Sequence, residues 1–519
     1  MKKEIVRKAG FSMVTVLVIA AMLLAGCGTN NVQAPGTNEA ETQTQASGTV
    51  QQSNAEILNC RYVTPGSGYR DSDYMEGVIS KKMQADGVNV KLQFSYIPWD
   101  VWEQKVNLLL STGEEFDLIH TMENGYPNTS SLVGKGAIVQ LDELIDKYGE
   151  NIKNVVPDYC WTQATMNGKI YSIPANWIEQ ANVLGWISVR KDLLDKYNLE
   201  IPKTLDELIS TAETLQKELP EKYYCTIHGL SIINGFLFRT FASYPFYLKD
   251  GEEIAMIDKD GNVKSWLESE EFKKQCEFFR KLYTKGLISP DILSMKNDDI
   301  TNLKNNGKFL FHLERMFSTI PTLKANVPEA ELTGFMLNPE KGTIRMNAFL
   351  NCNTVPSSSQ HPEAAIKFLN WAYGSQENMD LLVLGEKDKY WKDAGEKRYQ
   401  PVKETDPDYS FDWWQIGDIK FQRFPTNASE EQIKYEGTPA ENAQNFIGMG
   451  FNFDSTPVKV EYANCIAEMQ NSIYPLKFGV VDYDKEFAGA LKRMKAAGLD
   501  KIIEEYGRQF SEFMKSKGK

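Results

Sequence analysis

The chain has 519 residues, of which 42% are hydrophobic and 11% aromatic, and a formal net charge of −13. This length and composition predict a globular protein of two or three domains with a large core, and not a fibre. The negative charge argues against nucleic acid as the partner, because phosphate binding depends on concentrated Lys and Arg.

The N-terminus joins basic residues to a short apolar run. The run 11–24 is shorter than the roughly 20 apolar residues that a membrane-spanning helix needs. Basic residues precede it at Lys2, Lys3, Arg7 and Lys8, and small residues follow it. This order is typical of an export signal, with a retained membrane helix as the alternative.

The end of this run, Leu23-Leu24-Ala25-Gly26-Cys27, is similar to a bacterial lipobox. The resemblance implies a signal peptide over 1–26 and a diacylglyceryl group on the sulfur of Cys27, whose two acyl chains make a stable membrane anchor. Residues 28–53 contain no aromatic side chain and cannot bury enough apolar surface to fold. We therefore expect 27–55 to be the lipidated cysteine and a flexible tether, roughly 28 Å in root-mean-square length.

Six other cysteines are spread widely through the body of the chain. They form no CxxC pair and show no metal-ligand spacing, so the sequence predicts neither a metal nor a cofactor. Their wide separation favours individually buried thiols over disulfides. They are Cys60, Cys160, Cys225, Cys276, Cys352 and Cys465.

The body opens with alternating strand and helix patterns. Strands are expected at 57–63, 90–96 and 116–119, and the second of these alternates apolar and polar residues. A helix is expected between each pair of strands, the first with its apolar face formed by Met75, Val78, Ile79 and Met83. This order predicts an α/β layer.

A second α/β region is expected after Leu141. Its strand candidates are 170–174, 183–189, 309–313 and 332–337. Thr204 and Glu207 form a capping box at the start of one helix, and two further helices are expected over 272–283 and after Pro362. The character of the sequence changes from about Tyr373, and the chain ends in an amphipathic helix from Leu499 to Phe513.

The sequence lacks the motifs of several enzyme classes. It contains no GxxxxGK[ST], HExxH or GxSxG, and its four histidines are isolated, which disfavours nucleotide-binding loops and zinc or serine hydrolases. A glycosidase needs only two carboxylates that the fold brings together, so this alternative stays open.

Tryptophans beside loops are the positive signal for a binding site. Flat rings suit the faces of sugars, and small-ligand sites are aromatic clefts with a few polar groups, although each ring taken singly can also be part of the core. Trp99 and Trp177 are the better candidates because turn residues precede them. The full set is Trp99, Trp102, Trp161, Trp177, Trp186, Trp371, Trp413 and Trp414.

Several segments together resemble one family. Residues 167–174 read Asn-Gly-Lys-Ile-Tyr-Ser-Ile-Pro, residues 188–194 read Ser-Val-Arg-Lys-Asp-Leu-Leu, and Pro202-Lys203-Thr204 follows. With 116–119, 307–309 and 450–459, these segments resemble those of extracellular solute-binding lipoproteins of ABC importers. The resemblance is to family 1, of the maltose-binding type, and to its LipO-like subgroup with that group's C-terminal domain.

The resemblance implies an α/β, two-lobed periplasmic-binding-protein-like fold (type II) with a hinge between the lobes and a helical C-terminal extension. Ligand binds in the cleft and the lobes close over it. The expected divisions are a signal peptide at 1–26, a lipidated tether at 27–55, the first part of lobe 1 at 56–140, lobe 2 at 141–312, a return segment of lobe 1 at 313–373, and a C-terminal region at 374–519 that packs on lobe 2.

The resemblance also implies a set of ligand contacts. Arg315 would either bind an acidic sugar or pair with Glu314, and His312 would either contact ligand or be a satisfied hinge residue. From the first lobe the contacts would be Pro65, Gly66, Ser67, Trp99, His120 and Tyr126. From the second lobe and the return crossing they would be Tyr171, Asn176, Trp177, His312, Glu314 and Arg315, with Trp413 or Trp414 from the C-terminal region.

By this resemblance the protein would be a monomeric, lipid-anchored receptor on the extracellular face of the membrane, and the tether suggests a single-membrane bacterium. It would capture a saccharide, either an oligosaccharide or a modified sugar, and pass it to the permease subunits of an ABC transporter without catalysing a reaction. The open alternatives are a receptor for a peptide-like or other polar solute, a sensory receptor for a membrane kinase, and a surface glycosidase.

Overall fold

The computed structural model describes residues 56–122, 127–166, 168–227, 234–244, 246–248, 253–316, 319–345, 351–404, 406–440, 443–451 and 453–518. The predicted signal peptide, Cys27 and its tether, and the predicted contact Tyr126 lie outside these ranges. No helix within the ranges is both long and apolar enough to cross a membrane.

The first lobe is built on a five-stranded sheet with the order β2-β1-β3-β15-β6. Strand β1 pairs in parallel with β2 and β3, whereas β15 runs antiparallel to β3 and β6. The strands are β1 (Leu58–Pro65), β2 (Val90–Ile97), β3 (Leu118–Met122), β15 (Asn351–Thr354) and β6 (Ile173–Pro174). Its helices are α1 (Ser72–Ala85), α2 (Trp102–Thr112), α3 (Thr129–Gly134), α4 (Asp142–Tyr148), α5 (Glu150–Val155), α6 (Trp161–Ala164) and α14 (Pro362–Ala372).

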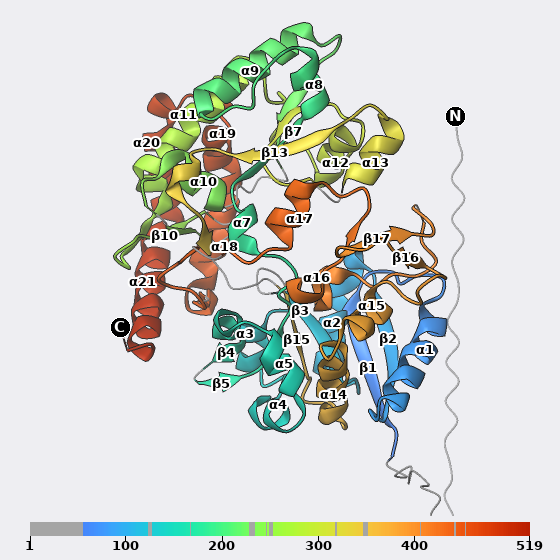
Figure 1. The fold of residues 1–519 in the computed structure, drawn as a ribbon. Coiled ribbons are helices and arrows are strands. Elements are labelled where there is room, and N and C mark those ends of the chain that lie inside the picture. Colours follow the sequence, from blue (N-terminus) through green and yellow to red (C-terminus); the bar gives the residue numbers. More distant parts are fainter. Residues whose placement is uncertain are drawn as a thin grey trace, which may run out of the picture. The chain divides into compact units, whose positions relative to one another are not determined.

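Helices cover both faces of this sheet. Helices α1 and α14 lie beside β1 and β2 (Figure 1). Tyr62 packs in the core that includes side chains of α1 and α14, and its neighbour Val63 packs in a separate cluster with Trp102 of α2. Successive side chains of a strand point to opposite faces, which explains why β1 is apolar at consecutive positions. Met75 and Ile79, four residues apart on α1, are fully buried, as the helical spacing predicts.

The second lobe is built on the sheet β13-β7-β12-β8. The strands are β7 (Trp186–Arg190), β8 (Tyr224–Thr226), β12 (Phe309–His312) and β13 (Leu332–Met336), and a hairpin sheet joins β9 (Tyr247–Leu248), β10 (Ala255–Ile257) and β11 (Val263–Ser265). Its helices are α7 (Gln180–Val183), α8 (Lys191–Lys196), α9 (Leu205–Glu218), α10 (Asn234–Phe241), α11 (Glu270–Thr284), α12 (Asn297–Asn305) and α13 (Ile320–Asn326).

The C-terminal region divides between the two lobes. Its first half holds α15 (Gln376–Val383), α16 (Trp413–Ile416), α17 (Glu430–Glu436) and the sheet of β16 (Trp391–Asp393), β17 (Arg398–Pro401) and β18 (Phe424–Pro425). Met379, Leu382 and Ile416 of this half join the core of the first lobe. The second half packs into the core of the second lobe. It holds β19 (Gln444–Asn445), α18 (Lys459–Glu468), a π-helical turn (Met469–Ile473), α19 (Tyr474–Lys477), α20 (Tyr483–Ala497) and α21 (Leu499–Ser516).

The lobe divisions differ from those expected from the sequence. Strand β6 pairs with β15, and Ile145 and Ile152 pack in the first core, so the chain from α4 to β6 lies with lobe 1. Strand β13 pairs with β7, which keeps the chain with lobe 2 through that strand. These pairings join strands that are remote in sequence, and motif order does not specify them.

Most predicted elements are present, with local differences. The strand expected at 183–189 begins only at Trp186, because α7 occupies 180–183 and Gly185 turns the chain at φ +82°. Thr204 caps α9 by accepting from the amide of Glu207 at 3.2 Å, but the Glu207 carboxylate accepts from the amide of Lys203 instead of Thr204. The six cysteines of the body are buried, as predicted, and form no disulfide within the described residues.

Candidate ligand-binding site

Two tryptophans from distant parts of the chain stack on the first lobe. Trp99 lies in the 3-10 turn Trp99–Val101, and Trp414 lies in α16. Their ring centroids are 5.8 Å apart with an interplanar angle of 29°. Trp99 remains 52% exposed, so part of this aromatic surface is open to a ligand.

His120 also contacts the Trp414 ring. Its ring lies edge-on to the Trp414 ring at 5.0 Å, and its Nε2 is 3.2 Å from Oδ1 of Asn351. Burial lowers the pKa of His120 to about 4, so the imidazole is neutral at pH 7. A neutral imidazole has one donor and one acceptor nitrogen, which suits hydroxyl groups and not a charged partner.

The end of β1 is tied to α16. Gln415 donates from Nε2 to the carbonyl of Pro65 and to Oδ2 of Asp412, both at 3.2 Å, and accepts from the hydroxyl of Thr64. Gly66 has φ +124°, a backbone conformation that residues with a side chain rarely adopt. The loop 65–67 is thereby held beside the start of α16.

A second aromatic group forms where the loop after β6 meets α16. The indole N–H of Trp413 donates to the carbonyl of Trp177 at 2.9 Å, and the Arg315 guanidinium lies 5.2 Å from the centroid of the Trp177 ring. The indole N–H of Trp177 has no hydrogen-bond acceptor among the described residues.

Two ion pairs join the second aromatic group to the segment around α17. Arg315 Nη1 lies 2.5 Å from Oε1 of Glu436, the last residue of α17. Arg345 Nη2 lies 3.0 Å from Oε2 of Glu179, and its guanidinium is 4.1 Å from the centroid of the Tyr159 ring. Both carboxylates are buried, which makes these pairs costly to break.

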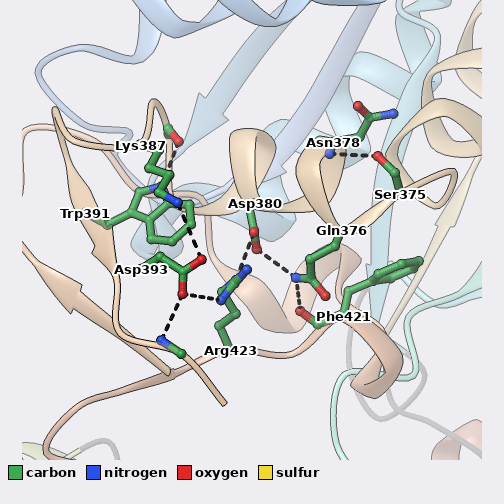
Figure 2. Close-up of polar contacts among 11 residues, drawn as sticks. Ser375, Gln376, Asn378, Asp380, Lys387, Trp391, Asp393, Phe421 and Arg423 are labelled. Carbon is green, nitrogen blue, oxygen red and sulfur yellow. Dashed lines mark hydrogen bonds and ion pairs between the residues drawn. The ribbon is translucent and has the colours of Figure 1, made fainter. Parts of the chain in front are cut away.

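A polar cluster fixes the chain on the C-terminal side of α16 (Figure 2). Arg423 donates from Nε to Oδ2 of Asp380 at 2.8 Å and from Nη1 to Oδ1 of Asp393 at 3.4 Å. Gln376 donates to the other Asp380 oxygen and to the carbonyl of Phe421, both at 2.8 Å. The cluster thus anchors the segment after α16 to α15, and with it the position of the two tryptophans.

Two cavities adjoin these groups. One, of about 140 Å³, is lined by Asp412, Trp413 and Tyr399 among others. The other, of about 500 Å³, shares Tyr399 with the first and extends between β16–β18 and Lys324 of α13. Aromatic side chains therefore continue from Trp413 toward the second lobe.

The structure gathers many of the residues expected from the sequence but not all. Trp99, His120 and Trp414 form one group, and Trp177, Arg315 and Trp413 form another. Pro65 and Gly66 lie beside α16, and Ser67 next to them is exposed. The backbone carbonyl of Asn176 accepts from the amide of Ile419 at 2.9 Å, which holds Asn176 against the turn after α16.

The remaining expected residues are placed differently. His312 is fully buried in β12, with Nδ1 3.0 Å from the Thr226 hydroxyl and Nε2 3.7 Å from a carboxylate oxygen of Glu314. Tyr171 lies with the first lobe instead of the second, because its carbonyl accepts from the Thr354 hydroxyl. Arg315 pairs with Glu436, which neither of the two sequence-based alternatives included.

Sequence reasoning missed the polar partners of the aromatic rings. Asp412 and Gln415 flank the tryptophans of α16, so the aromatic signal at 411–414 was their nearest marker. Glu436 lies 121 residues beyond Arg315, and Asn351 lies 231 residues beyond His120. No local pattern links residues at such separations.

Comparison with known proteins identifies the family. Residues 67–311 match the model of the bacterial extracellular solute-binding proteins, and residues 447–515 match a domain of unknown function, DUF3502. A carbohydrate ABC transporter substrate-binding protein of Streptococcus pneumoniae serotype 4 is 23% identical over 448 residues, which cover 84% of this chain and 87% of that protein. The fructooligosaccharide ABC transporter substrate-binding protein FusA of the same organism is 28% identical over 302 residues, 54% of this chain and 53% of that protein.

A solved structure shows the same fold. The N-glycan transport solute binding protein NgtS of Streptococcus pneumoniae aligns with a TM-score of 0.73 at 20% identity, covering 89% of this chain and 100% of that chain. The two sheets with their covering helices, and the helical C-terminal region, fit the regions that these comparisons match. Residues 67–311 therefore form a domain of the bacterial extracellular solute-binding protein family, residues 447–515 form a DUF3502 domain, and the chain has the two-lobed fold of its structural neighbours.

Proposed function

We propose that this protein is the substrate-binding component of an ABC transporter and captures an extracellular oligosaccharide for import. The stacked pair Trp99 and Trp414, with half of the Trp99 surface open, is the observation that carries the proposal. An exposed flat ring suits the face of a sugar, and the neighbouring buried groups His120 and Asn351 are uncharged. The names of the relatives, which include carbohydrate, fructooligosaccharide and N-glycan transport, support the same ligand class.

The proposal includes binding without catalysis. The names of the relatives describe them as substrate-binding or solute-binding proteins. Such a protein would present its ligand to permease subunits without changing it. The test is a thermal-shift screen of the chain from Gly28 onward against oligosaccharides, short peptides and polar metabolites. A ligand at 100 times its dissociation constant adds about 2.7 kcal/mol of stability. A sugar that binds and is recovered intact supports the proposal, whereas a cleaved sugar supports the glycosidase and a peptide response supports the peptide receptor.

We also propose that Cys27 carries the lipid anchor and that the tether holds the receptor at the outer face of the membrane. Its position after an apolar run and small residues supports this. Cys27→Ser should move the protein from the membrane fraction to the medium with its ligand affinity unchanged. Thr29→Ser, two residues away, is the control and should stay with the membrane. Retention of the Cys27→Ser protein in membranes would instead favour an uncleaved helix.

A further inference from the structure

The charges around the two aromatic groups bear on which oligosaccharides the site accepts. A site for an acidic sugar needs a cation whose charge no protein carboxylate already neutralises, usually an arginine that can form a bidentate pair. Arg315, over the Trp177 ring, is the arginine at the aromatic surface. Whether the charge of Arg315 is already neutralised within the protein therefore bears on whether the site can bind an anionic sugar.

Arg315 is already neutralised by a firmly held carboxylate. Its partner Glu436 has a side chain that is only 7% exposed, and the second oxygen of Glu436 accepts from Gln432 at 3.0 Å within α17. A ligand carboxylate that displaced Glu436 would leave a buried, unpaired charge, which is strongly unfavourable. Arg315 is therefore not available to an anion.

Arg345 is neutralised in the same way. The side chain of its partner Glu179 is 2% exposed, and Glu179 also accepts from the amides of Ala181 and Ala440. The other terminal nitrogen of Arg345 donates to Asn445 at 3.0 Å. Its charge and its two terminal nitrogens are thus used within the protein.

Arg423 lines the smaller cavity with Trp413, but it is paired with Asp380 and Asp393, and the other charged residues that line this cavity, Asp380 and Asp412, are acidic. Asp412, directly before α16, accepts from Gln415 and forms no ion pair with a basic side chain in the described part of the chain, and burial raises its pKa. Glu314 follows β12 beside Arg315 and lies near His312. The segments 123–126, 317–318 and 346–350, which adjoin site residues in sequence, contain Glu123 but no Lys or Arg.

Resting on the proposed function, we propose that this site accepts uncharged oligosaccharides and rejects those that carry carboxylates. Both arginines are neutralised, and the remaining charges would repel an anion. Repulsion and unpaired charge are an effective means of rejecting a wrong ligand.

The test uses matched sugars that differ only in charge. The probes are maltotetraose, mannotetraose and galactotetraose, each compared by calorimetry with its C6-oxidised uronate form, on the chain from Gly28 onward. For every neutral probe that binds, we expect the uronate form to bind at least about tenfold more weakly, which corresponds to 1.4 kcal/mol. A uronate form that binds as tightly as its neutral parent overturns the inference and leaves the proposed function standing.

A variant on α17 tests the cause of the selectivity. Glu436→Gln frees the charge of Arg315, so the ratio of neutral to uronate affinity should fall at least about threefold. Glu431→Gln makes the same change at an exposed position of the same helix and should leave the ratio unchanged. An unchanged ratio in a folded Glu436→Gln protein contradicts the role given to this pair. If no sugar binds in these series or in the wider screen, the proposed function fails and the inference fails with it.

Discussion

The two halves of the C-terminal region are both rich in aromatic residues but use them differently. In the first half, Trp413 and Trp414 of α16 are only partly buried and meet Trp177 and Trp99 from other parts of the chain. In the second half, Phe510 packs against Phe451 at 5.1 Å and is buried in the core of the second lobe. The comparison shows that the surroundings of a ring, and not the local density of rings, separate a binding surface from a core.

The largest expected effect is in the second half. Phe510→Ala should lower the free energy of unfolding by about 3–5 kcal/mol, because it removes a fully packed ring and leaves a cavity. Urea unfolding followed by fluorescence measures this, and the affinity of the folded fraction should not change. Val460→Ala, at a 61% exposed position of α18, is the control and should change stability by less than about 0.5 kcal/mol. If Phe510→Ala instead lost ligand affinity with little loss of stability, the second half would also contribute to binding, and the difference between the halves would not hold.

Next in size is a pH effect in the first half. Asp418 is buried beside Asn176, and burial raises its pKa to about 6, above its usual value near 4. The folded state therefore holds this proton more tightly than the unfolded state, so the stabilisation is present below about pH 4 and is lost as the pH rises through 6. Asp418→Asn should remove on the order of 2–3 kcal/mol of this pH dependence between pH 4 and 7. Equal pH dependence of urea midpoints in both proteins would contradict this assignment.

Trp414→Ala tests the binding surface itself. Removing the ring that contacts both Trp99 and His120 should weaken oligosaccharide binding by about 1–3 kcal/mol, because buried aromatic contacts dominate such sites. The melting temperature should change little, in contrast to Phe510→Ala. Trp414→Phe keeps a flat ring and should retain most of the affinity in calorimetry. Unfolding of the alanine variant would show that this ring is part of the core.

The smallest effect concerns one hydrogen bond. Trp413→Phe removes the donor to the Trp177 carbonyl and should weaken ligand binding by about 0.5–1.5 kcal/mol. Calorimetry with the same oligosaccharide measures the change. An affinity equal to that of the wild type would mean that the contact of Trp177 with Arg315 is enough to position its ring.

The sequence predicts elements well and long-range pairings poorly. The alternation of Val90, Leu92 and Phe94 predicts β2 because one face of the strand is buried. The Thr204 cap likewise predicts the start of α9, since both signals are local. The placement of β6 in the first lobe depends on its pairing with β15, which no local signal specifies. The same limit applies to the candidate site, where rings are visible in the sequence but the pairing of Arg315 with Glu436 is not.

The six buried thiols provide a separate stability reporter for each lobe. Cys60, Cys160 and Cys352 lie in the first core, while Cys225, Cys276 and Cys465 lie in the second. A thiol reagent can modify a buried cysteine only when its surroundings open, so labelling rates follow local unfolding. Mass spectrometry of the labelled peptides would then give opening rates for the two cores in a single experiment, with no engineered probe. Comparing those rates with and without ligand would show which lobe the ligand stabilises more.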